Sequence, residues 1–211
     1  MRVKSRWNYK EKEHTIPEIA SALAFNAWRI GQQACLNLEN EGFETTSQSQ
    51  RLDVIAEFLA FLLHYLDRHV AERMPMEQRA ELLQSFAGEL ARHMQDNRRD
   101  VEGPGDYKPA FIELLNARHD EYAEYAFDGD DPGFALRNTF GQHVAEVMGE
   151  HMRRWIPDQV EAIEVPEALA PFRRALRNLL PKQDKGDDAA DTEGVATRPD
   201  PHSLQANNTE D

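Results

Sequence analysis

Residues 51–73 read RLDVIAEFLAFLLHYLDRHVAER, and this stretch decides the fold class. Its side chains are apolar around most of a helical circumference, which predicts a helix enclosed by other helices. One narrow stripe of the same helix is polar and carries Asp53, Glu57, His64, Asp67 and Arg68. The stripe is either the single solvent-facing side of the helix or a polar seam inside a bundle. The second alternative would mark a functional site.

Further amphipathic stretches on both sides of residues 51–73 predict an all-α, single-domain helical bundle of five to six amphipathic helices. We expect helices at about 15–41, 49–73, 76–97, 107–127 and 132–154, with shorter pieces at 157–163 and 166–180. Thr15 and Glu18 are spaced as a capping box at the first boundary. The predicted core is centred on large apolar side chains: Phe58, Phe61, Leu62, Leu66, Phe111, Leu115 and Phe140.

Composition divides the chain into three parts. Residues 1–15 are a polar, basic lead-in in which Lys and Arg alternate with Trp7 and Tyr9. Such an arm could contact an anionic partner, but a flexible arm, or one that lies on the protein's own acidic surface, is the simpler expectation. Residues 16–180 form the helical domain. Residues 181–211 are acidic and almost free of large apolar side chains, so we expect a disordered tail.

Charge and cysteine content limit the partners and the compartment. The 38 Asp and Glu against 24 Lys and Arg give a net charge of -14. Such a surface repels phosphate backbones, so nucleic-acid binding is not expected. No apolar run approaches the roughly 18 residues that span a bilayer, and the first residues lack the apolar core of a secretory signal. The single Cys35 cannot form an internal disulfide, which fits a reducing compartment and predicts a cytoplasmic protein.

Known catalytic and metal-binding motifs are absent from the sequence. It has no Gly-x-Ser-x-Gly, no phosphate-binding glycine loop and no dinucleotide fingerprint. Di-metal bundles carry Glu-x-x-His on two helices, and no Glu in residues 16–180 is followed by His at that spacing. The segment DGDDPG at 128–133 lacks the ligand spacing of a calcium loop. A non-standard metal site from Glu57, His64, Asp67 and His143 stays an alternative to a solvated stripe with intrahelical charge pairs.

Arg118 lies between Leu114 and Tyr122 on the apolar face of the predicted helix 107–127. A buried guanidinium needs a carboxylate partner, and its planar fork suits one. Asp67 or Glu57 can be that partner if the second and fourth helices pack together. Alternatively, only the aliphatic stem of Arg118 is covered, and the charged end reaches water.

These observations predict a non-catalytic, cytoplasmic helical interaction or adaptor protein that self-associates. The alternative is a helical-bundle protein, either a binder of a ligand or metal or an enzyme, that uses a seam of Glu57, His64, Asp67, Arg118 and His143. The sequence assigns no catalytic residue, metal ligand or cofactor, and it identifies no small-molecule ligand. Exposure of the seam separates the two hypotheses, because an enclosed pocket favours a ligand and an open surface does not.

Overall fold

The computed structural model describes residues 14–149 and 153–180, and within them the predicted all-α bundle is confirmed. The long helices come first in the chain: α1 (Ile16–Asn40), α2 (Gln48–Val70), α3 (Met76–Glu102), α4 (Lys108–Tyr122) and α5 (Phe134–Met148). Three helical pieces then follow one another without a break: α6 (Ile156–Gln159), the π-helical turn η1 (Val160–Glu164) and α7 (Val165–Leu179). None of the described helices is long and apolar enough to cross a membrane.

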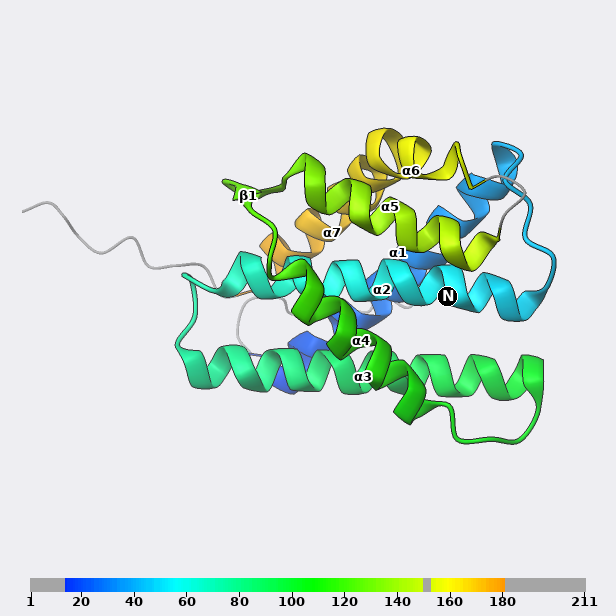
Figure 1. Ribbon diagram of the computed structural model, residues 1–211. Helices are drawn as coiled ribbons and strands as arrows, with labels where there is room; N and C mark the ends of the chain where they lie inside the picture. Colours follow the sequence, from blue (N-terminus) through cyan, green and yellow to red (C-terminus); the bar gives the residue numbers. More distant parts are fainter. Residues whose placement is uncertain (1–13, 150–152, 181–211) are drawn as a thin grey trace, which may run out of the picture.

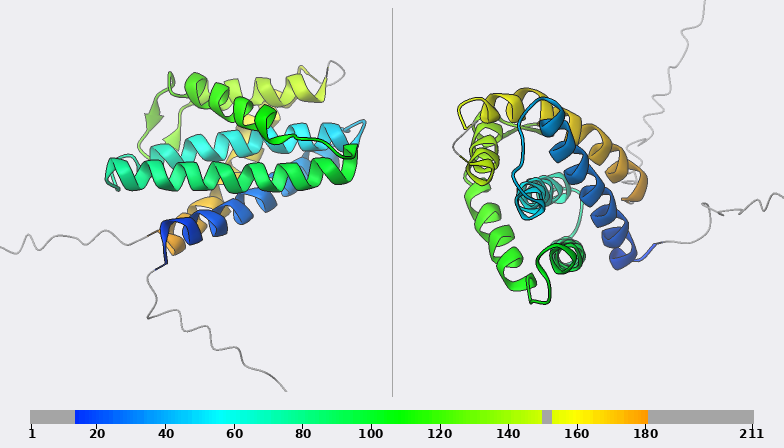
Figure 2. Two further views of the ribbon diagram at one scale, coloured as in Figure 1. Left: turned by 90° about the horizontal axis from the view of Figure 1, so that it is seen from below. Right: turned by 90° about the vertical axis from the view of Figure 1, so that its right-hand side faces the viewer.

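The helix formed by the quoted stretch, α2, runs through the middle of the bundle. Figure 1 shows α3 and α4 on one side of it and α5 on the other, and the end-on view in Figure 2 shows the remaining helices as a ring around it. The helices α1, α3, α4 and α5 all pack against α2. All seven predicted core residues are buried. Their rings interlock, since Phe61 stacks on Phe140 with centroids 4.5 Å apart and Phe58 meets Phe140 edge-on at 4.9 Å.

Local sequence signals set the beginning of α1 and the end of α3. The capping box at the start of α1 is present, because the Glu18 carboxylate accepts the Thr15 N–H at 2.9 Å and the Thr15 hydroxyl accepts the Glu18 N–H at 3.4 Å. Gly103 ends α3 with φ of 93°, a backbone conformation that side chains with a Cβ rarely adopt.

Other boundaries differ from the prediction. The helix α3 continues to Glu102 rather than Asn97, and α4 ends at Tyr122 rather than near residue 127. After α4, β1 (Phe127–Asp128) and β2 (Asp131–Pro132) form a small antiparallel hairpin that turns at Gly129, with φ of 60°. Ala126, expected on the inner face of the fourth helix, is therefore exposed.

The last helix closes the bundle against the first. The helix α7 packs along α1. Phe172 of α7 reaches the core, where its ring lies 6.2 Å from Tyr65 and 6.3 Å from Phe86. The predicted basic lead-in, apart from its last two residues, and the predicted acidic tail lie outside the described residues.

Candidate functional site

The polar stripe of α2 is buried at its centre. Glu57, His64 and Asp67 are 1%, 1% and 4% exposed, whereas Arg68 is exposed and Asp53 is partly exposed. The interpretation as a solvated stripe with intrahelical pairs is therefore wrong for these three residues. They form a seam between helices, and their charged partners come from α3 and α4.

Arg118 of α4 holds the first carboxylate of the seam. Its Nε and Nη2 donate to the two oxygens of Glu57 at 2.8 and 2.9 Å, which is the two-pronged contact expected of a guanidinium. The side chains are 18% and 2% exposed, so the pair is mostly enclosed. Of the two partners considered for Arg118, Glu57 is the one it contacts. Arg118 also lies 3.5 Å from Glu121, which lies 2.8 Å from His143.

Asp67 is held by an arginine that the sequence did not single out. The Nε and Nη2 of Arg79, near the start of α3, donate to the Asp67 oxygens at 2.6 and 2.7 Å. His119 of α4 lies 3.8 Å from the same carboxylate. Arg79 was missed because it lies on a polar stretch of α3. The position of Arg79 in the first turn of the next helix could have indicated it. Two helices joined by a short connection pack side by side, so the first turn of α3 lies beside the last turns of α2.

His64 lies between these two ion pairs without a hydrogen bond. Neither of its ring nitrogens has a partner, and the nearby Tyr122 hydroxyl and His119 Nδ1 are also buried without partners. The His64 ring lies 5.5 Å from the His119 ring and 5.7 Å from Tyr122. Burial, with a further contribution from His119, lowers the pKa of His64 from 6.5 to about 4. The ring is therefore neutral at pH 7.

The seam does not have the composition of a metal centre. Within residues 14–149 and 153–180, no group of three or more His, Cys, Asp or Glu side chains is arranged to hold a metal ion. The carboxylates of Glu57 and Asp67 are already bound by arginines. His143 contacts Glu57 only indirectly, at the end of a series of contacts that runs through Arg118 and Glu121. The arrangement is suited to fixing α2, α3 and α4 relative to one another.

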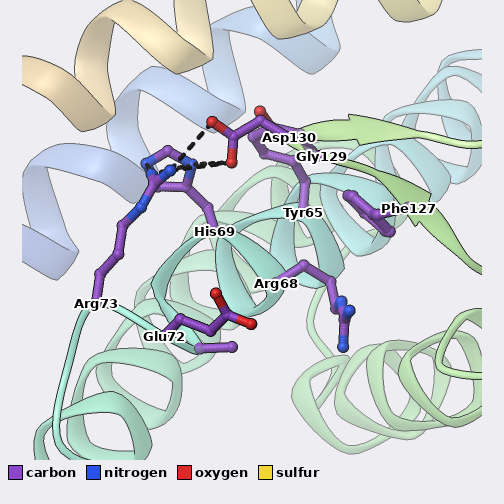
Figure 3. A pocket seen from close by; sticks show the side chains of 9 residues that line it. Tyr65, Arg68, His69, Glu72, Arg73, Phe127, Gly129 and Asp130 are labelled. Carbon is purple, nitrogen blue, oxygen red and sulfur yellow. Dashed lines mark hydrogen bonds and ion pairs between the residues drawn. The ribbon is translucent and has the colours of Figure 1, made fainter.

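Two pockets open near the ends of the seam. Figure 3 shows the smaller one, of about 160 Å³, between the end of α2 and the β1–β2 turn. In it, Arg73 and His69 point toward Asp130, while Arg68 lies against the Phe127 ring. The charges that line it are therefore largely paired among themselves.

The other pocket, of about 370 Å³, lies between α2 and the first half of α4. Glu57 and Leu114 line it together with Tyr107, Phe111 and the Arg98–Asp53 ion pair. It is the one cavity among those described here that reaches a residue of the predicted seam, although the carboxylate of that residue is occupied by Arg118.

A third site, the α1–α7 groove, was not predicted. It has a volume of about 340 Å³ and lies between α1 on one side and η1 and α7 on the other. Its apolar wall is Ile30, Ala34, Ala168 and Pro171. The amides Asn26, Gln33 and Asn37 of α1 all line this groove.

Two carboxylates at one end of the groove share an amide. Gln33 donates to Asn37 at 2.8 Å, and Asn37 donates to Glu167 at 2.9 Å and to Glu164 at 3.5 Å. Glu164 is 1% exposed and also accepts from Gln159 at 3.3 Å. Burial raises the pKa of the Glu164 carboxyl, with smaller contributions from the charges of Glu167 and Glu41.

The backbone around Glu164 is irregular as well. Glu164 ends the π-helical turn η1, and single π turns occur frequently at functional sites. Pro171 lies inside α7 and has no N–H, so the carbonyl of Glu167, four residues earlier, lacks its usual helical donor. The groove wall therefore presents two carboxylates beside an irregular stretch of helix. Of the residues that line the groove, Arg29 is the only cation, and its guanidinium lies over the Phe25 ring.

Comparison with known proteins adds no relative to this description. No protein-family model, curated protein or solved structure matches the chain.

Proposed function

We propose that the protein is a non-catalytic helical interaction module, and that the α1–α7 groove binds a basic peptide segment of a partner. The observation that carries the proposal is Glu164, a carboxylate that is 1% exposed and held only by amide donors. A buried carboxylate gains most from a cationic partner, and here no described Lys, Arg or His forms an ion pair with Glu164 or Glu167.

The shape and polarity of the groove fit a peptide. Its wall of Ile30, Ala34 and Pro171 can cover an apolar side chain, while the carboxylates of Glu164 and Glu167 can accept hydrogen bonds from Lys or Arg. Two exposed apolar residues of α1, Phe25 and Leu36, extend the contact area beyond the groove. A partner segment that alternates basic and aromatic residues satisfies both features.

Fluorescence anisotropy with a labelled short peptide of Arg, Lys, Trp and Ser tests the proposal. We expect Glu167→Lys to weaken binding by about tenfold or more, the equivalent of roughly 1.4 kcal/mol. Glu81→Lys is the matched control, because Glu81 is exposed on α3 and the substitution changes the net charge equally. Equal binding by the unmodified protein and both variants would show that the peptide is attracted by the acidic surface in general and not by the groove. That result would refute the proposal.

Self-association is a separate part of the proposed function. The exposed large apolar residues in addition to Phe25 and Leu36 are Met76, Val101, Phe134, Trp155 and Ile163. Scattered exposed apolar residues are normal on a monomer, so the mass of the protein in solution is the deciding measurement. A monomer at all accessible concentrations would remove self-association and leave the groove proposal unchanged.

A second candidate function is the binding of a small ligand within the seam. The partnerless nitrogens of His64, with the partnerless Tyr122 hydroxyl beside them, favour it, because buried polar groups usually have a partner, protein or water. A neutral, hydrogen-bonding molecule suits this position, since His64 is held in its neutral form. High-resolution crystallography tests the idea, and ordered water alone at these atoms would reduce the seam to a structural element.

A further inference from the structure

We infer that the basic N-terminal arm, residues 1–13, occupies the α1–α7 groove of its own chain and competes with the partner segment. The inference rests on the proposed function of the groove and names its occupant in the absence of a partner. The arm has the required chemistry, with five Lys and Arg against two Glu and with Trp7 and Tyr9 among them.

The position of the arm makes the contact possible. The arm ends at residue 13, three positions before the first residue of α1, and α1 itself forms one wall of the groove. Asn37, which donates to Glu164 and Glu167, lies roughly 32 Å along α1 from Ile16. An extended segment from Arg6 to Thr15 spans up to roughly 33 Å, and a segment from Arg2 spans up to roughly 46 Å. An arm that reverses direction before Ile16 can therefore bring Arg2 or Lys4 to the carboxylates, whereas Arg6 lies farther back along the groove.

The two ends of the chain differ in the sign of their charge. Residues 181–211 carry eight Asp and Glu against three Lys and Arg, so they have the same sign as the groove. Of the two termini, only the arm complements Glu164 and Glu167 in charge.

Limited trypsin digestion of the full chain tests whether the arm is docked. The rate of cleavage after Arg6 is compared with the rate for the same bond in a free synthetic peptide of residues 1–13, and hydrolysis of an added chromogenic arginine substrate reports trypsin activity in each sample. We expect cleavage in the chain to be about fivefold slower or more, and high salt to remove the protection of a charge-dependent contact.

Groove variants identify where the arm docks. The double variant Glu164→Gln with Glu167→Gln should restore cleavage after Arg6 to the rate of the free peptide, whereas the control Glu81→Gln should leave the protection intact. A chain in which Arg6 is cut as fast as in the peptide overturns the inference. Protection that increases with protein concentration also overturns it, because the arm then binds a second copy.

Peptide binding separates this inference from the proposed function. Lys4→Glu with Arg6→Glu should empty the groove and tighten binding of the labelled basic peptide by about fivefold or more. Lys182→Glu with Lys185→Glu makes the same change in net charge and should have no such effect. If binding depends on Glu167 but not on the arm substitutions, the groove function stands and the arm inference fails. If no peptide binds after the arm is altered, both fail.

Discussion

The contact between Arg118 and Glu57 illustrates how a single side chain fixes two helices. We expect Arg118→Ala to destabilise the protein by roughly 3–5 kcal/mol, because it leaves a carboxylate of 2% exposure without its partner. Arg118→Lys should also be costly, since an ammonium cannot make both hydrogen bonds. Urea denaturation measures both changes. Arg92→Ala is the control, because its pair with Glu89 is largely exposed and should contribute less than about 1 kcal/mol. A tolerated lysine would show that Arg118 is solvated.

His64 makes the stability of the protein depend on pH. Its folded-state pKa of about 4 is below the value of 6.5 for an unperturbed histidine. Between these values the unfolded chain binds a proton that the folded chain does not, so stability falls as pH decreases from about 6.5 to about 4, by at most roughly 3 kcal/mol. Above about pH 7 the ring contributes no pH dependence. The groups facing it are His119 and Tyr122 from α4, and Asp67 and Arg68 from α2.

The variant His64→Phe isolates this effect. It keeps a ring among His119, Tyr122 and Phe127 but cannot be protonated. We expect the unmodified protein to lose more unfolding free energy than the variant as pH is lowered from 7 to 4. His69 and His93, whose pKa values burial also lowers, cancel in this difference. A difference that stays constant with pH would show that His64 is not held in its neutral form.

The sequence predicted the seam residues better than their partners. Glu57, His64 and Asp67 were recognisable because polar side chains interrupt an otherwise apolar helix, and Arg118 because it interrupts an apolar face. Arg79 and His119 have polar sequence neighbours, so only the packing of α3 and α4 on α2 reveals them. Glu164 was missed for a similar reason, since its burial results from the π turn and from the approach of α1.

At the scale of elements, α5 and α6 touch at a glycine. A Cβ added at Gly141 would lie 2.8 Å from the Cα and 2.9 Å from the carbonyl oxygen of Pro157, so the two backbones would have to separate. We expect Gly141→Ala to destabilise the protein by roughly 1–3 kcal/mol. Gly88→Ala on α3 is the matched control, because nothing lies within 4 Å and a helical alanine should stabilise by about 0.5–1 kcal/mol. Thermal unfolding of the two variants measures the contrast, and equal effects would contradict the close packing of α5 on α6.

Helix boundaries could be predicted where a capping residue fixes the end of the helix. They were predicted less well where contacts with other helices fix it. The third helix was expected to end at about residue 97, but α3 continues through Arg98, which bridges to Asp53 and Glu102, and it ends only at Gly103. The fourth helix stops early because the turn residues after Phe127 form a hairpin. Pro166 does not break the last helix, and it lies directly after the π-helical turn η1, in the first turn of α7.

For the whole molecule, the described residues account for one continuous core. We expect truncation after Leu180 to leave the thermal midpoint nearly unchanged, because residues 181–211 contain almost no large apolar side chains. Truncation before Val165 is the contrasting variant, since it removes the buried Leu169, Phe172 and Leu176. It should abolish cooperative unfolding, which calorimetry detects. A loss of several degrees on removing residues 181–211 alone would show that they pack on the domain.

The pairing of the first helix with the last has a consequence for synthesis. On the order of 120 residues separate Asn40 from Val165, and at roughly 5–20 residues per second a ribosome needs on the order of 6–25 s to add them. During that time α1 and the neighbouring ends of α2 and α3 lack the cover of Phe172 and Leu176. The nascent chain therefore exposes apolar surface of an incomplete core until α7 has been synthesised. Its yield in the cell should depend on chaperones that bind α1 during translation.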